Sequence, residues 1–281
     1  MNWGKWGAGF TTVQYLQLIE ESLAAGITSF DHADIYGGYT TESEFGQALK
    51  QKPSLRQQMQ LITKCGIKML AAERPGNKIK SYNTSKEYII QSAEQSLLNL
   101  QTDYLDLFLI HRPDPLMNPD EIAEAFLQLK KEGKVLHFGV SNFTPSQTSL
   151  LHSRFIVEVN QVEISLLHLD PFLNGQLDHC IEHNIIPMAW SPLGGGKLNA
   201  PEKDGKIKRI LSVAEKLGKK YAADPEDILF AFLAKHPAGI LPVAGTTKIS
   251  RLQSALKAVE INIEREEWFM LWSASTGQEV P

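Results

Sequence analysis

The feature that most restricts the fold of this chain is a regular alternation of short apolar runs with longer amphipathic runs. Short runs that are typical of strands are centred near residues 28, 60, 105, 136, 157, 186 and 240. Each is followed by a longer run with apolar residues at helical spacing. The alternation continues through the 281 residues without a linker or a change in composition. It predicts an α/β fold built on a parallel sheet.

Capping and turn residues set the expected element boundaries. We expect strands at residues 27–31, 60–64, 104–110, 135–140, 156–160, 185–190 and 240–243. We expect helices at residues 11–25, 41–50, 171–183, 206–221, 224–235, 250–259 and 265–275, with two more beginning near Asn118 and Thr144. A further helix is capped by Thr84 or Ser85 and reaches about Leu100. Thr41 and Glu44 form a predicted capping box. Residues 65–83 are predicted to form an irregular loop.

Repeated strand–helix–strand units of this kind close into a (β/α)8 TIM barrel. The short segment before the first helix would be a truncated eighth strand at the N-terminus. A doubly wound open sheet is the main alternative, but its glycine-rich dinucleotide signature is missing after the early strands. We therefore predict one barrel domain that spans residues 1–281.

Composition excludes several classes of partner. The net charge is −4 and 21% of residues are charged, which gives no general attraction to nucleic acid or to an anionic membrane. No apolar run approaches the roughly 20 residues of a membrane span, and no signal peptide is evident. Cys65 and Cys180 have no metal or redox spacing and are expected to be reduced, buried thiols. We expect a cytoplasmic protein; the oligomeric state stays open.

Residues 30–39 carry an unusual density of polar side chains at the end of the first predicted strand. Asp31 closes that strand and Tyr36 lies in the loop after it. Taken alone, the stretch could be an ordinary polar loop. In a barrel, however, the C-terminal ends of the strands converge on one mouth. Lys64 and His111 end the next two strands, so they are expected to lie near Asp31 and Tyr36.

These four side chains favour carbonyl reduction. An ammonium beside a phenol stabilises the phenolate that forms when Tyr36 gives up its proton. Asp31 would hold Lys64 in place, and His111 could orient a carbonyl oxygen. Protein side chains cannot supply a hydride, so a nicotinamide cofactor is implied.

Six segments in succession resemble motifs of the aldo/keto reductase family. They are residues 30–37, 61–64, 104–111, 139–143, 160–163 and 190–194. Their order and spacing match the family over residues 26–259, and the resemblance implies a (β/α)8 barrel that binds NADPH or, less often, NADH. It also implies a catalytic tetrad of Asp31, Tyr36, Lys64 and His111, with Tyr36 as general acid. The expected substrate is a small-molecule aldehyde or ketone.

The resemblance further implies a set of cofactor-binding residues. Asp31, Ser141, Asn142, Gln161, Trp190, Ser191, Pro192, Leu193, Gly194 and Lys197 would line the nicotinamide and pyrophosphate part, and Gly245, Thr246, Thr247, Lys248 and Arg251 the adenosine phosphate part. The last group would favour NADP(H) over NAD(H). Trp190 stands where the family often has Tyr, and Gly245 where many members have Lys. Ser254 and Ala255 replace a Glu-Asn pair that often contacts the adenine.

Other functions fit the sequence less well. A metal hydrolase would use His32, Asp34, His111 and Asp31, but the chain has no His-X-His pair and Lys64 would have no function, so no metal is expected. A lyase with a Schiff base on Lys64 leaves Tyr36 and Trp190 unexplained. The remaining alternative is a cofactor-binding redox sensor or regulatory subunit of the same fold with little turnover.

Overall fold

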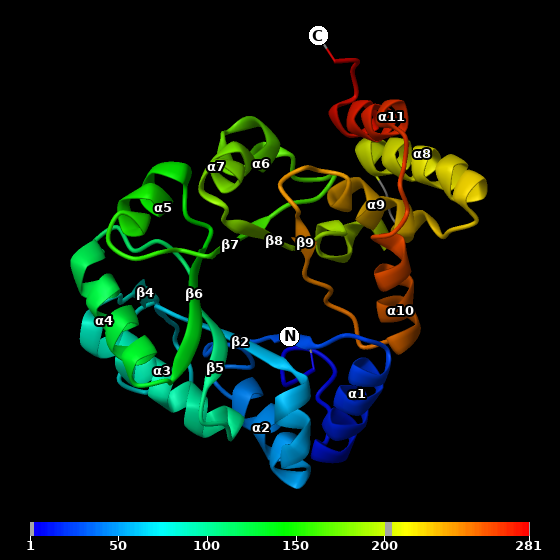
Figure 1. Cartoon of the computed structure of the whole chain (residues 1–281). Helices are drawn as coiled ribbons and strands as arrows, with labels where there is room; N and C mark the ends of the chain where they lie inside the picture. The colour runs from blue at the N-terminus through cyan, green and yellow to red at the C-terminus, as the bar shows by residue number, and fades with distance from the viewer. Residues whose placement is uncertain (1–2, 200–203, 281) are drawn as a thin grey trace. The chain divides into compact units, whose positions relative to one another are not determined.

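The structure of this chain is a computed structural model that describes residues 3–199 and 204–280. Its residues group into two compact units. Figure 1 labels the helices and strands of both. The first unit contains residues 3–160 and 245–249, and the second contains the other described residues. Strand β7 (Val159–Glu163) leads from the first unit into the second. The two units are described separately below.

The first unit alternates strands and helices. Its elements are α1 (Thr12–Ala24), β1 (Ser29–Asp31), α2 (Thr41–Gln51), the 3-10 helix η1 (Pro53–Gln58), β2 (Gln60–Cys65), β3 (Ile67–Lys68), β4 (Ser81–Tyr82), α3 (Lys86–Leu100), β5 (Leu105–Ile110), α4 (Pro119–Lys131), β6 (Val135–Ser141) and α5 (Pro145–His152). Strands β1, β2, β5 and β6 are neighbours in this order and pair in parallel. The register aligns Asp31 with Ile62 and Lys64 with Leu109. The ends of β1, β2 and β5 therefore lie at one edge.

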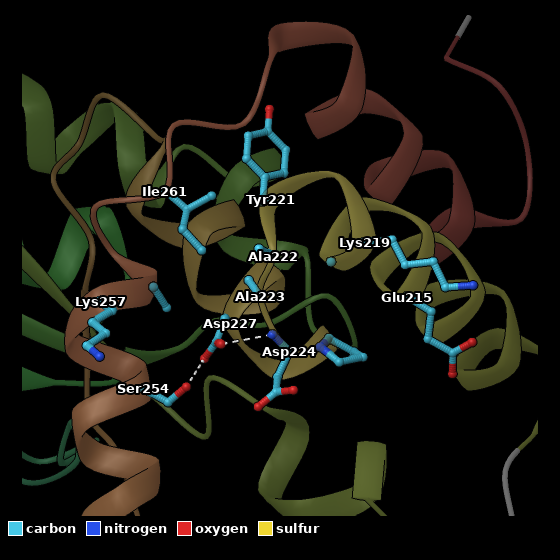
Figure 2. A pocket seen from close by; sticks show the side chains of 13 residues that line it. Glu215, Lys219, Tyr221, Ala222, Ala223, Asp224, Asp227, Ser254, Lys257 and Ile261 are labelled. Atoms are coloured by element: carbon cyan, nitrogen blue, oxygen red, sulfur yellow. Dashed lines mark hydrogen bonds between the residues drawn. The ribbon is translucent and has the colours of Figure 1, made fainter.

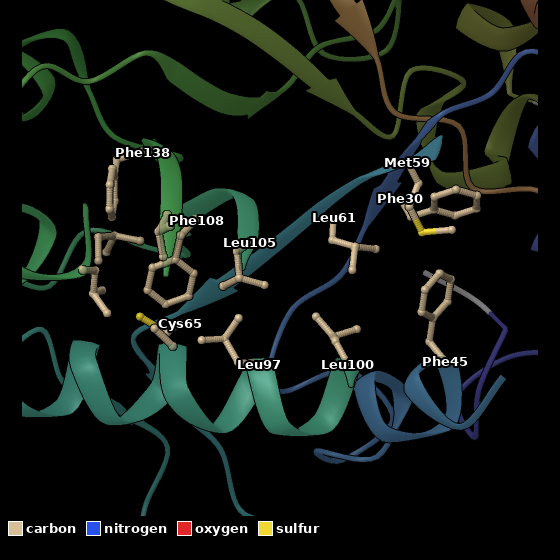
Figure 3. Close-up of a cluster of buried hydrophobic side chains, with 14 of the residues drawn as sticks. Phe30, Phe45, Met59, Leu61, Cys65, Leu97, Leu100, Leu105, Phe108 and Phe138 are labelled. Atoms are coloured by element: carbon tan, nitrogen blue, oxygen red, sulfur yellow. The ribbon is translucent and has the colours of Figure 1, made fainter. Parts of the chain in front are cut away.

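Large apolar side chains fill the space between these strands and their helices. Figure 3 shows Leu61, Leu105 and Phe108 from the strands facing Leu97 and Leu100 of α3. All five side chains are buried. The alternation of strand and helix thus buries one continuous core and holds the strand ends in fixed positions.

The second unit continues the same alternation. Its elements are α6 (Asp170–Leu173), α7 (Gln176–His183), β8 (Ile186–Trp190), the 3-10 helix η2 (Gly194–Asn199), α8 (Gly205–Tyr221), α9 (Pro225–Ala234), β9 (Leu241–Pro242), α10 (Ile249–Ala258, in this unit from Ser250) and α11 (Arg265–Thr276). Strands β8 and β9 pair in parallel. Helix α8 packs on α9 and on α11.

Several expected boundaries are wrong. Helix α2 is preceded by Thr40 rather than Thr41, and the Thr40 hydroxyl donates to the Glu44 side chain instead of capping the backbone. The single helix expected over residues 171–183 is two helices, because Gly175 has a φ of 80° between them. Residues 3–11 contain no strand, and Trp3 packs into the core against Phe30. The loop at residues 65–83 contains the antiparallel pair β3–β4.

Gly46 allows α2 and α3 to pack closely. A Cβ at this position would overlap the carbonyl oxygen of Asn99 and lie 2.8 Å from the carbonyl carbon of Leu100. Since both are backbone atoms of α3, they cannot rotate away. Gly46→Ala is therefore expected to lower the free energy of unfolding by about 1–3 kcal/mol, although alanine is the better helix former.

Urea unfolding of Gly46→Ala and of wild type measures this cost. Gly76→Ala is the control, since nothing lies within 4 Å of the added Cβ and its effect should be within about 0.5 kcal/mol. Equal stability of Gly46→Ala and wild type would show that the helices can separate at no cost.

Candidate active site

A buried ion pair joins the ends of β1 and β2. The Lys64 ammonium donates to both carboxylate oxygens of Asp31, at 2.8 and 2.7 Å, and to the carbonyl oxygen of His32 at 2.7 Å. Lys64 is fully buried, whereas the Asp31 side chain is 14% exposed. The sequence predicted Lys64 as the last residue of this strand. In the structure β2 extends to Cys65, so Lys64 is its penultimate residue. These three oxygen acceptors hold the ammonium group and fix the position of its positive charge.

Tyr36 and His111 lie beside this ion pair. The Lys64 nitrogen is 5.3 Å from the centroid of the Tyr36 ring. The His111 ring meets the Tyr36 ring edge-on, with the centroids 5.8 Å apart. His111 follows β5 directly, and its backbone N–H donates to the carbonyl of Cys65 at 2.7 Å. The first unit therefore brings together the four residues of the predicted tetrad.

Burial and charge set the protonation of Lys64 and His111. Burial is the largest influence and disfavours the Lys64 ammonium, but Asp31 and then Tyr36 together outweigh burial and raise the pKa of Lys64 above its ordinary value. Burial, and then the charge of Lys64, hold the pKa of His111 well below its ordinary value. Near neutral pH the site therefore combines one fixed positive charge with a neutral imidazole.

His32, next to Asp31 in the chain, is fully buried, and the sequence predicted no function for it. Its ring packs edge-on against Phe45 with centroids 4.5 Å apart, and neither ring nitrogen has a hydrogen-bond partner within the described part of the chain. Burial lowers the pKa of His32 well below its ordinary value. Across the described ranges, no three His, Cys, Asp or Glu side chains are grouped as a metal site.

We expect His32→Phe to make the protein less sensitive to acid. Below about pH 6.5 the unfolded chain binds a proton at His32 that the folded chain excludes, so the stability of the wild type falls as pH falls. As pH falls below this value, the free energy of unfolding of His32→Phe should fall less steeply than that of wild type. The two slopes should differ by about 1.4 kcal/mol per pH unit. Urea unfolding at pH 8, 6 and 5 measures both slopes. At pH 8 the histidine is neutral in both states, which isolates the packing difference; parallel pH profiles would contradict the prediction.

Ser141 and Asn142 also belong to the first unit. Ser141 is the last residue of β6 and is buried, and Asn142 follows it with a φ of 59°. The Asn142 amide donates to the Ser141 hydroxyl at 2.7 Å. A left-handed backbone directly after a strand turns the chain sharply and places an amide and a hydroxyl side by side at the strand end.

The second unit holds Gln161, Trp190 and the segment at residues 191–197. Gln161 is buried within β7 rather than at the end of the expected strand. The strand was expected to begin at Ile156 because this residue is apolar. In the structure Ile156 is exposed and lies before β7, which begins at Val159. Trp190 is the last residue of β8, and Ser191 after it has a φ of 51°. Pro192, Leu193, Gly194 and Lys197 follow, with Lys197 exposed within η2.

Along the chain, the predicted phosphate-binding residues lie just before α10 and in its first turn. Gly245, Thr246, Thr247 and Lys248 form the irregular segment before this helix, and Arg251 is in its first turn. The backbone N–H of Lys248 donates to the Thr246 hydroxyl at 3.1 Å. The Arg251 guanidinium lies 3.9 Å from the Glu226 carboxylate of α9. This acidic neighbour comes from another helix and could not be predicted from the sequence.

Comparison with known proteins identifies the family. The model of the aldo/keto reductase family matches residues 1–275. This chain belongs to the aldo/keto reductase family. It is 46% identical over 275 residues to the uncharacterized oxidoreductase YcsN of Bacillus subtilis, covering 97% of this chain and 91% of that protein. It is 48% identical over 271 residues to the oxidoreductase YdhF of Escherichia coli, covering 95% and 89%.

Further relatives extend the comparison. The 6-dehydroglucose reductase of Agrobacterium fabrum is 42% identical over 264 residues, covering 93% of this aldo/keto reductase and 88% of that protein. A solved thermostable aldo-keto reductase in complex with the inhibitor epalrestat has a TM-score of 0.77 at 26% identity, covering 94% and 88%. The aldo-keto reductase of Klebsiella pneumoniae, solved with NADPH, has a TM-score of 0.74 at 24% identity, covering 92% and 84%.

The predicted fold class, a (β/α)8 barrel, is confirmed by these structural neighbours together with the parallel strand–helix alternation. Whether residues 1–281 act as one domain stays a prediction. No helix in the described ranges of this aldo/keto reductase is long and apolar enough to cross a bilayer.

Proposed function

We propose that this protein reduces an aldehyde or ketone to the alcohol with NADPH, and that Tyr36 is the general acid. The observation that carries the proposal is the buried Lys64 ammonium, which Asp31 holds 5.3 Å from the Tyr36 ring centroid. A buried cation is expensive to maintain unless it is paired, so its place beside a phenol suggests a chemical role.

In this proposal Tyr36 delivers a proton to the carbonyl oxygen. The O–H bond of Tyr36 breaks and an O–H bond forms on the substrate, which leaves a phenolate. The Lys64 ammonium stabilises that negative charge, and the interaction is strong because Lys64 is buried away from water. Asp31 keeps the ammonium in place throughout. Solvent then restores the proton of Tyr36.

His111 would orient the substrate. The low pKa of its ring keeps it neutral, so one nitrogen carries a proton and the other does not. Its Nδ1 is buried without a hydrogen-bond partner in the residues described. A neutral imidazole that donates an N–H to the carbonyl oxygen polarises the carbonyl and adds no second positive charge beside Lys64.

The side-chain chemistry of the predicted cofactor residues supports a nicotinamide dinucleotide as the cofactor. When bound, this cofactor supplies the hydride that protein side chains lack. The hydroxyl and amide groups of Ser141, Asn142 and Gln161 match the donors and acceptors of a carboxamide, and Trp190 offers a flat ring for stacking. Thr246, Thr247, Lys248 and Arg251 would supply hydroxyl and cationic donors for the 2′-phosphate, and residues 191–194 and Lys197 would contact the pyrophosphate. This donor set supports NADPH over NADH.

An assay of aldehydes and ketones with purified protein and NADPH tests the proposal. Loss of NADPH absorbance should accompany formation of the alcohol. 6-Dehydroglucose belongs in the panel, because a 42% identical relative bears the name of its reductase. The free, buried thiols of Cys65 and Cys180 fit a reducing compartment, so we propose that the enzyme acts in the cytoplasm. Tight NADPH binding without turnover of any carbonyl would instead indicate the redox-sensor alternative.

A further inference from the structure

In the second unit, a hydrogen bond joins the acidic first turn of α9 to α10. Asp224 caps α9, and Glu226 and Asp227 lie in its first turn. The Asp227 carboxylate accepts hydrogen bonds from the Asp224 backbone N–H at 3.0 Å and from the Ser254 hydroxyl of α10 at 2.7 Å. Figure 2 shows both bonds in the wall of a cavity of about 720 Å³ that residues of α8, α9 and α10 line. The bond from Ser254 fixes the carboxylates of α9 relative to α10.

This arrangement places Glu226 beside Arg251. Arg251 and Ser254 are three residues apart on α10 and therefore share a face of the helix. A nitrogen of the Arg251 guanidinium lies 3.9 Å from the Glu226 carboxylate, beyond hydrogen-bond distance. The Arg251 side chain is 50% exposed and that of Glu226 is 29% exposed. A pair of this kind is weak, so Arg251 can turn toward another anion.

We infer that Glu226 sets the preference of this enzyme between NADPH and NADH; the inference rests on the proposed function, in which Arg251 binds the 2′-phosphate. A phosphate with a charge between −1.5 and −2 must take Arg251 from Glu226 and also approach the Glu226 carboxylate. Both effects weaken NADPH binding. A ribose without this phosphate meets no such repulsion, and its 2′-hydroxyl can donate to a carboxylate. Glu226 therefore reduces the advantage in affinity that Arg251 gives to NADPH over NADH.

Titrations of the purified protein with NADPH and with NADH, followed by tryptophan fluorescence, test this role. Glu226→Gln should tighten NADPH binding about two- to fivefold, the range for partly exposed charge pairs, and should not tighten NADH binding. The gain should shrink as salt is added. Glu226→Gln should likewise tighten the binding of adenosine 2′,5′-bisphosphate but not of 5′-AMP. Because neither ligand contains a nicotinamide, this result would assign the effect to the 2′-phosphate. Arg251→Ala should weaken NADPH more than NADH.

Glu266→Gln is the matched control. Glu266 lies in the first turn of α11, so its substitution removes the same charge from the same position of a different helix. Equal gains for Glu226→Gln and Glu266→Gln, or equal changes for the two cofactors, would overturn the inference. Equal losses of affinity for NADPH and for NADH in Arg251→Ala would show that Arg251 does not bind the 2′-phosphate. This result would overturn the inference and leave the reductase proposal intact. Failure of the wild type to bind either cofactor would overturn the proposed function itself.

Discussion

Tyr36→Phe is expected to lower kcat/KM for carbonyl reduction by about 10²–10⁴-fold, the usual contribution of a general acid. The phenylalanine keeps the ring and its edge contact with His111, but it has no proton to give to the carbonyl oxygen. The affinity for NADPH should stay close to that of wild type, because the lost hydroxyl contributes to proton transfer. Steady-state rates with an aldehyde and fluorescence titration of NADPH measure the two effects on the same preparation.

Tyr39→Phe is the matched control. Tyr39 lies in the same loop, and its hydroxyl accepts from the backbone N–H of Met69 at 2.8 Å. Its loss removes a structural hydrogen bond and should cost about 1 kcal/mol of stability without comparable loss of turnover. If Tyr36→Phe reduced aldehydes as fast as wild type, Tyr36 would not be the general acid. If Tyr39→Phe were equally slow, the loss would reflect the loop rather than the proton donor.

The fold was largely predictable because its signals are local. Ser85, Asn118 and Thr144 cap α3, α4 and α5 through their side chains, as their positions before apolar runs indicated. The errors arose where tertiary structure decided the boundary. The polar side chains of Asn160 and Gln161 are buried at the centre of β7, whereas the apolar Ile156 before this strand is exposed. Hydrophobicity alone therefore placed the strand three residues too early.

The candidate site was predictable where strand ends place it. Asp31, Lys64 and His111 lie at or next to the ends of parallel neighbours, so the topology brings them together once the strands are found. The acceptor role of the His32 carbonyl toward Lys64 carries no side-chain signal in the sequence. Glu226 was missed for another reason: its contact with Arg251 depends on how α9 packs on α10. The assigned roles of these residues remain predictions.

Lys64→Met is expected to abolish reduction and also to destabilise the fold, and the two losses can be separated. The variant leaves the Asp31 carboxylate, only 14% exposed, without the ammonium that pairs with it. Removing one partner of a buried ion pair costs about 3–5 kcal/mol. Turnover should fall at least as far as in Tyr36→Phe, because nothing then stabilises the phenolate. The stability that Lys64 contributes is present at neutral pH and is lost as pH rises above about 10.4 through its raised pKa.

The double variant Asp31→Asn/Lys64→Met distinguishes a chemical role of Lys64 from a structural one. A neutral amide beside methionine leaves no unpaired charge, so the double variant should recover much of the stability that Lys64→Met loses. It should not recover turnover, because the positive charge beside Tyr36 is still missing. Urea unfolding and steady-state rates on the three proteins measure both quantities. Recovery of activity together with stability would show that Lys64 and Asp31 only support the fold, and that Tyr36 can release its proton without them.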